Sequence, residues 1–328
     1  LSGERVPHIE TFVDLPVFQA AEARGDKVYP TTRIYRRLVC QFDEYLVDLF
    51  RVEGGKTHDW FHHGIGGEPG VSIPVQREDR FQPARYVVGG ERAYRTGETD
   101  GPFTVTWTIP AQEEADYAGR RREVHSRVTL AGQPGQRVNV LSTYPDPGRH
   151  SLMVRRAGPS SLFAAVHEAY FDAPIAEAVN AIESSGCRAF EIRHRAGGRR
   201  IVLYDGDSAD GDPSLDGLLG IVQFDPHGRV IGLGLLRGTS LRYRGVALRT
   251  DKETCLSVSF MDDRVKLVSS PGIAYRTVEG QPVFLRGADV TARLSVPAEA
   301  SHTGAAMDLR VEVPGQADEG PRLVELRQ

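Results

Sequence analysis

An acidic side chain and a cluster of histidines lie close together between residues 38 and 64, in the stretch LVCQFDEYLVDLFRVEGGKTHDWFHHG. Residues 45–52 alternate as a β-strand does, which places Asp48 in a row with apolar neighbours on one face. The opposite face is also mostly apolar, so we expect this strand to be covered on both sides. A carboxylate buried in such a strand requires a polar or charged partner, because desolvating it alone is costly.

The turn after this strand supplies candidate partners for the carboxylate. Gly54 and Gly55 form a two-residue loop that tolerates positive φ at both positions, which predicts a β-hairpin. In that hairpin Asp48 lies opposite Phe61, and paired residues point to the same face. His63 is then the diagonal neighbour of Asp48, about 7–8 Å away between backbones and within reach of its side chain.

The remaining histidines of the stretch point to the other face in this register. We expect His58 and His62 to make packing or loop contacts beside Trp60, although a bulge would exchange His62 for His63. Two interpretations stay open for Asp48: a metal site shared with His63, or a buried hydrogen bond to a histidine or ion pair with an arginine.

The rest of the chain consists of short β-branched and aromatic runs between turns rich in Gly, Pro and Asp. This pattern predicts an all-β fold, most naturally two large packed sheets, with a domain boundary near residues 238–248. The best helical periodicity is short and covers residues 175–183. The strands we expect cover 84–88, 104–109, 123–130, 137–144, 161–170, 199–204, 220–224, 230–236, 256–260, 265–269, 281–285, 288–295, 307–313 and 322–326.

Composition narrows the function classes. The 44 acidic residues outnumber the 40 dispersed basic ones, which argues against a nucleic-acid partner. No apolar run is long enough to span a bilayer. The sequence starts with Leu1 and not Met, so we expect a processed chain or an excised portion of a longer one, without a recognisable signal peptide.

The three cysteines match neither a zinc nor a disulfide spacing, so we expect core thiols, with one disulfide as the alternative.

Three segments, in this order along the chain, resemble the heparinase II/III-type polysaccharide lyases. Residues 8–14, HIETFVD, resemble the His-Asn-Thr-Val-x-Val-Asp segment that opens the β-sandwich of that family. Residues 45–64 look like the strand–turn–strand that follows it, and residues 161–170 are similar to a later strand. The resemblance is carried by the order of the segments more than by any single motif.

The resemblance implies a fold and an activity. The chain would be the large antiparallel β-sandwich (supersandwich) at 1–240 and the smaller C-terminal β layer at 241–328, and the family's N-terminal α/α toroid would be a separate chain or a removed domain. Such lyases cleave uronic-acid-containing polysaccharides by β-elimination. A base removes the C5 proton, the adjacent carboxylate is neutralised, and an acid assists the departing C4 oxygen. An acidic polysaccharide partner and a periplasmic or secreted location follow from the same resemblance.

The resemblance also implies roles for individual residues. His8 matches the histidine that the sandwich contributes to the active-site rim, where it would hold the uronate carboxylate or share in proton transfer. The family's asparagine after that histidine is replaced by Ile9. Some members bind a structural zinc ion in the sandwich; Asp48 and His63 match two of its ligands, and Glu10 stands where a second histidine is usual.

Three functions follow as alternatives. The first is the sandwich portion of a lyase, which predicts that this chain is inactive without the toroid. The second is a non-catalytic carbohydrate-binding or structural β module. The third is a sugar-modifying enzyme complete on a large sandwich, like the aldose epimerases, and it requires an acid–base pair on one concave face that the sequence does not identify.

Overall fold

A computed structural model describes most of the chain as β-structure. It describes residues 7–25, 28–65, 67–78, 94–111, 122–142, 149–261, 264–270, 275–278, 281–284, 290–302, 306–313 and 322–327. These residues fall into two compact units, which we describe one at a time. Unit 1 includes Gly25–Arg37 and Glu44–Ile175, and unit 2 includes Val6–Arg24, Leu38–Asp43 and Ala176–Gln328.

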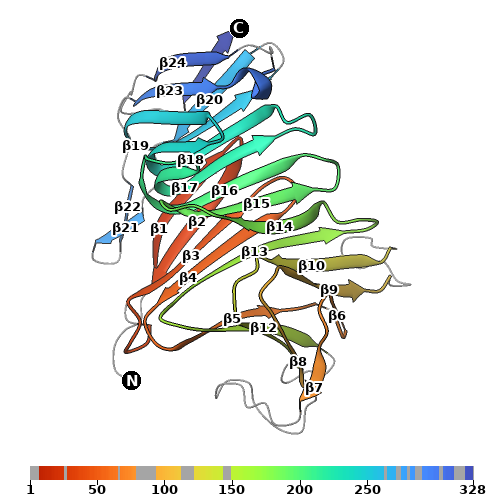
Figure 1. Cartoon of the computed structure of the whole chain (residues 1–328). Coiled ribbons are helices and arrows are strands. Elements are labelled where there is room, and N and C mark those ends of the chain that lie inside the picture. The colour runs from red at the N-terminus through yellow and green to blue at the C-terminus, as the bar shows by residue number, and fades with distance from the viewer. Residues whose placement is uncertain are drawn as a thin grey trace. The chain divides into compact units, whose positions relative to one another are not determined.

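Unit 1 is a sandwich of two β-sheets (Figure 1). The first sheet has the strand order β3-β4-β13-β10-β9-β6, and the second has the order β5-β12-β11-β8-β7. Strand β3 (Ile34–Gln41) contributes its residues up to Arg37 to this unit. The other strands are β4 (Leu46–Glu53), β5 (Thr57–His63), β6 (Gly70–Val71), β7 (Gln76–Glu78), β8 (Tyr94–Thr99), β9 (Phe103–Ile109), β10 (Val124–Leu130), β11 (Gln136–Ser142), β12 (His150–Ala157) and β13 (Ser160–Tyr170).

The core of unit 1 lies between these two sheets. Phe50, Trp107 and Phe163 of the first sheet pack with Trp60 and Leu152 of the second, and each is at most 7% exposed. Burial of such large side chains is the main source of stability of a sandwich. Strand β4 is buried on both faces, as its apolar pattern predicts, because residues 47 and 49 on its other face are also covered.

Unit 2 contains a ten-stranded antiparallel sheet and the strand set β1-β2-β3 (Figure 1). The path of the large sheet is β14-β15-β16-β17-β18-β19-β20-β25, with β23 paired to both β19 and β24. The strands are β1 (Pro7–Leu15), β2 (Phe18–Gly25), β14 (Ala176–Ile182), β15 (Arg188–His194), β16 (Arg199–Ser208), β17 (Ser214–Phe224), β18 (Val230–Tyr243), β19 (Val246–Phe260), β20 (Arg264–Ser270), β21 (Tyr275–Val278), β22 (Gln281–Phe284), β23 (Val290–Val296), β24 (Met307–Val313) and β25 (Arg322–Arg327), with a single 3-10 turn, η1 (Ala298–Ala300).

A buried ion pair fastens the N-terminal strands of unit 2 to its large sheet. The Glu22 side chain is fully buried, and the Nη1 of Arg237 donates to its Oε2 at 3.0 Å and to the hydroxyl of Thr11 at 3.3 Å. Arg237 has a φ of 46°, a left-handed conformation, at an irregularity where β18 and β19 lose register. The Phe18 ring also packs against the bare backbone of Gly234, where a Cβ atom would approach it to 2.5 Å.

The predicted fold class is confirmed. The described residues are almost entirely antiparallel β-structure in large sheets, with no α-helix among them. Each predicted strand coincides with part of an observed one, except 84–88, which lies outside the described residues. Within the part of the chain that the structure describes, no helix is long and apolar enough to cross a membrane.

The helix expected at residues 175–183 is instead strand β14. Its buried residues Ala176 and Val179 lie three positions apart, as they do along one side of a helix. A β-bulge between Ala176 and Ala178 produces this spacing within a strand that pairs with β15. The boundary expected at 240/241 lies inside β18, which runs to Tyr243 before a tight turn into β19.

The cysteines are free thiols in the structure, as expected for core residues. Cys40 and Cys255 are buried, and Cys187 is partly buried. Burial raises the pKa of the Cys40 thiol well above its usual value, so this side chain is unreactive in the folded protein.

Candidate functional site

The buried carboxylate of Asp48 lies at the centre of a polar cluster in unit 1. Its side chain is 1% exposed and faces the core between the two sheets. Arg37 of the neighbouring strand β3 donates from Nε to Oδ1 at 2.8 Å and from Nη2 to Oδ2 at 2.7 Å. Trp60 of the opposite sheet donates its indole N–H to Oδ2 at 3.2 Å. The forked pair with arginine therefore supplies the partner that a buried carboxylate requires.

Two histidines pack beside this ion pair. His62 of β5 and His167 of β13 have ring centroids 5.0 Å apart, and Nε2 of His167 lies 3.7 Å from Oδ2 of Asp48. The His62 ring is almost parallel to that of Trp60, at 6.1 Å, and lies 5.2 Å from that of Trp107. The cluster thus joins residues of both sheets through aromatic, imidazole and carboxylate groups.

The electrostatics of the cluster favour an ionised Asp48 and a neutral His62. Burial on its own raises the pKa of the Asp48 carboxyl, but the interactions with His167 and the Arg37 guanidinium outweigh it, and the net pKa is lowered. For His62, burial first and then the neighbouring His167 lower the pKa to about 4. An imidazole with this pKa is uncharged at neutral pH.

The predicted β-hairpin is wrong, and with it the predicted position of His63. Strand β4 pairs with β13, which places Asp48 opposite Ala165, while β5 pairs with β12 in the other sheet. Gly54 and Gly55, with φ of 96° and 86°, carry the chain from one sheet to the other instead of back along the same sheet. Asp48 and His63 therefore do not share a face.

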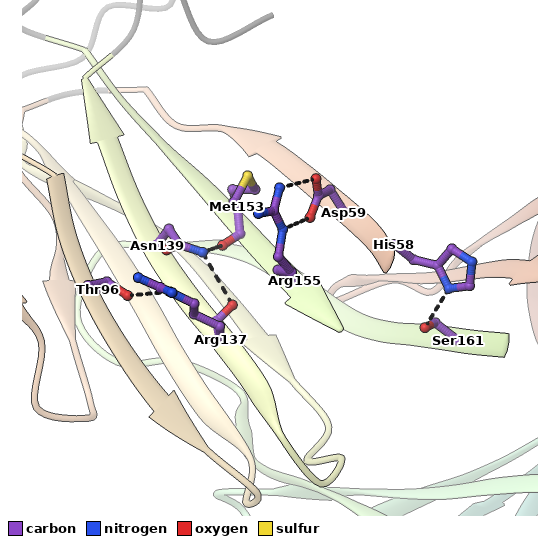
Figure 2. A network of polar contacts seen from close by, with 8 residues as sticks. All are labelled: His58, Asp59, Thr96, Arg137, Asn139, Met153, Arg155 and Ser161. Atoms are coloured by element: carbon purple, nitrogen blue, oxygen red, sulfur yellow. Dashed lines mark hydrogen bonds and ion pairs between the residues drawn. The ribbon is translucent and has the colours of Figure 1, made fainter. Parts of the chain in front are cut away.

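Strand β5 presents the opposite face to the core from the one predicted. Trp60 and His62 point inward, whereas Asp59 and His63 point outward. Figure 2 shows Asp59 in a forked ion pair with Arg155 of β12, at 2.7 and 2.8 Å. The exposed His63 has its Nδ1 2.9 Å from the hydroxyl of Ser151.

His58 makes a loop contact, as expected. Its Nε2 donates to the carbonyl oxygen of Gly54 at 2.7 Å, which leaves Nδ1 to accept from the Ser161 hydroxyl at 2.8 Å (Figure 2). Both side chains are at most 5% exposed. A serine next to an imidazole acceptor resembles a nucleophile with its base, but buried groups without access to substrate act as a structural tie.

The residues do not fit the predicted zinc site. Asp48 already accepts three N–H donors, two of them from Arg37, and His63 lies on the outer face of the other sheet. The third predicted ligand, Glu10, belongs to unit 2. Among the described residues, no three His, Cys, Asp or Glu side chains form a group that could hold a metal ion. The zinc itself stays a prediction.

Unit 2 carries the other predicted residues on one strand, β1. His8 and Glu10 are partly exposed, and strand alternation places them on the same face as Phe12, which is 45% exposed, and Asp14, although Ile9 between them is also 54% exposed. Thr11 and Val13 point inward and are at most 1% exposed. An exposed aromatic ring flanked by polar side chains is a surface on which a sugar ring can stack.

A polar pocket lies at the end of this strand. It has a volume of about 540 Å³ and surrounds the turn from β1 to β2, the end of β3 and part of β20. Gln19 donates to Asp14 at 2.9 Å, and Gln41, Asp43 and Lys266 also line the pocket. Carboxylates, amides and an ammonium are groups that hydrogen-bond sugar hydroxyls and pair with uronate carboxylates.

His62 packs beside Trp60, as expected from the sequence, but sequence reasoning missed Arg37, the contact of His62 with His167, and the exposed Phe12. Only Phe12 left a local signal, because alternation with buried Thr11 and Val13 places it on the outer face of its strand. Comparisons with known proteins add nothing to the site: no family model matches the chain, and no curated protein is similar to it.

Proposed function

We propose that this chain is the β-sandwich portion of a polysaccharide lyase that cleaves uronic-acid-containing polysaccharide by β-elimination. One observation supports the proposal: in the segment that bears the family resemblance, His8, Glu10 and Phe12 share one face of one strand, and Phe12 on that face is exposed. An imidazole, a carboxylate and an aromatic platform in one row are the groups that such a substrate needs. The all-β architecture agrees with the sandwich portion of that family.

In this reaction His8 would assist the proton transfers. A base takes the C5 proton, the electrons form the C4=C5 double bond, and the C4–O bond breaks as its oxygen receives a proton. His8 would hold or neutralise the uronate carboxylate, which stabilises the carbanion-like transition state, or share in the proton transfer. The other proton-transfer groups would come from an α/α toroid, and the location would be periplasmic or secreted.

A non-catalytic carbohydrate-binding module is the second candidate. The exposed Phe12 and the pocket that contains Asp14 and Lys266 favour it, because both suit binding and neither requires chemistry. The two candidates differ in the importance of His8 for turnover once a toroid is present.

The isolated chain is expected to bind a polyuronate without cleaving it. Calorimetric titration with a polyuronate oligosaccharide should detect binding that Phe12→Ala weakens about tenfold, as the loss of one stacking contact. The ultraviolet absorbance of the unsaturated product should not rise. The control for Phe12→Ala is Ala23→Ser, which changes an exposed site without an aromatic ring on the neighbouring strand β2. Full-rate product formation by this chain alone would contradict the division of roles between the sandwich and the toroid.

A further inference from the structure

Three arginines lie directly opposite one another across three adjacent strands of unit 2. Arg249 of β19 pairs with Arg293 of β23, and Arg293 pairs with Arg310 of β24. Directly opposite residues in antiparallel strands share a face, and neighbouring strands are about 4.8 Å apart. The three guanidinium groups therefore project side by side from one face of the sheet, and all three residues are exposed.

Folding alone does not explain this arginine row. Like charges directly opposite one another destabilise a sheet. Asp308 accepts from Nε of Arg293 at 3.0 Å and also from its Nη2, but both side chains are more than half exposed, where such a pair contributes little. The side chain of Arg249 forms no hydrogen bond or ion pair with any residue that the structure describes. A charged group that repels its neighbours and lacks a partner points to a ligand.

The arginine row lines a groove. Its volume is about 480 Å³, and its walls are the three arginines together with Thr250, Asp251 and Asp308. Arginines thus outnumber carboxylates in the groove. Asp308 fixes the central guanidinium, while the flanking Arg249 can approach an anion from the side.

We propose that the arginine row binds the carboxylate or sulfate groups of an acidic polysaccharide. Guanidinium forks match both anions through two parallel hydrogen bonds. The strand spacing is similar to the length of one sugar residue in an extended chain, so successive anionic groups can meet successive arginines. The choice of a polysaccharide rests on the proposed function and on the chain's excess of acidic residues, which disfavours nucleic acid.

Binding of the whole chain to immobilised probes tests the arginine row. The probes are a polyuronate, which carries carboxylates only, heparin, which adds sulfates, neutral dextran, and double-stranded DNA. Arg249→Glu should weaken binding to an acidic polysaccharide at least about tenfold, and Arg249→Ala should lower the slope of log K against log salt by about one. Arg188→Glu makes the same charge change at an exposed position of strand β15, which three strands separate from β19, and it should leave binding unchanged.

The outcomes separate this inference from the proposed function. Loss of polyuronate or heparin binding in Arg249→Glu but not in Arg188→Glu supports the arginine row, and the preferred probe identifies the anion. Equal binding to dextran, no difference between the two variants, or tighter binding to DNA overturns it. His8→Ala should keep the binding that depends on Arg249. If the native chain joined to its toroid forms no product but the arginine row still binds the probe, only the proposed function is refuted.

Discussion

Arg37→Ala is expected to lower the free energy of unfolding by about 3 kcal/mol at neutral pH, because it leaves a buried carboxylate without its counter-charge. Asp48 is 1% exposed and would keep only the indole N–H of Trp60 at hydrogen-bond distance. Urea unfolding of the variant and the native chain measures the difference. Arg37→Lys keeps the charge but not the two parallel hydrogen bonds, so its loss should be intermediate.

The effect of Arg37→Ala should shrink at low pH. In the native chain the pKa of Asp48 is lowered, so the pair stabilises above the unfolded value near 4 and is lost as pH falls through the folded value. Without the guanidinium, burial raises that pKa, and protonation relieves the unpaired charge. If Arg37→Ala lowers the free energy of unfolding by the same amount at pH 7 and at pH 4, this explanation is contradicted.

A surface arginine provides the matched control. Arg33→Ala removes the same side chain from a position that is 73% exposed and lies 3.9 Å from Glu53, and it should change stability by less than about 0.5 kcal/mol. Thermal unfolding of the native chain with and without a chelator tests the predicted zinc. A lower Tm in chelator, with about one zinc per chain by elemental analysis, would support the metal, whereas an unchanged Tm leaves Arg37 as the partner of Asp48.

His62 is expected to make the chain about 3 kcal/mol less stable as pH falls from about 6.5 to about 4. Burial lowers its pKa to about 4, so over this range the unfolded chain binds a proton that the folded chain does not. His62→Phe keeps a ring between Trp60 and Trp107 and removes the titrating group, so the stability of this variant should depend less on pH.

A histidine outside this cluster provides the control. His227→Phe makes the same replacement at an exposed turn position of unit 2, and it should leave the loss of stability caused by His62 unchanged. Urea unfolding at half-unit steps between pH 7 and pH 4 compares the three proteins. The free energy of unfolding of His62→Phe could instead depend on pH as steeply as that of the native chain. In that case the His62 imidazole is not shielded from protonation, which would contradict the structure.

Alternation of apolar residues was enough to predict the all-β fold, because a strand with one covered face repeats every two residues. It fails where the repeat is interrupted. The bulge in β14 spaces Ala176 and Val179 like a helix, and nothing nearby in the sequence distinguishes the two.

The partners of Asp48 could not be predicted from its neighbourhood. A double glycine with positive φ serves equally in a two-residue hairpin and at a corner between sheets, so Gly54-Gly55 does not determine which strand pairs with β4. That choice depends on β13, more than a hundred residues later, and on side chains that meet only in the folded core, such as Trp60 and His167. By contrast, the shared face of His8 and Glu10 follows from alternation alone.

The most direct test of the proposed function is the rate of unsaturated uronate formation by the chain joined to the α/α toroid that the proposal places before it. We predict product from a polyuronate, a loss of at least about a hundredfold in kcat for His8→Ala, and no loss for His227→Ala, which removes an exposed histidine from a turn of unit 2. Equal rates for the two variants would contradict the role of His8, and no product from the joined protein on any acidic polysaccharide would contradict the lyase itself.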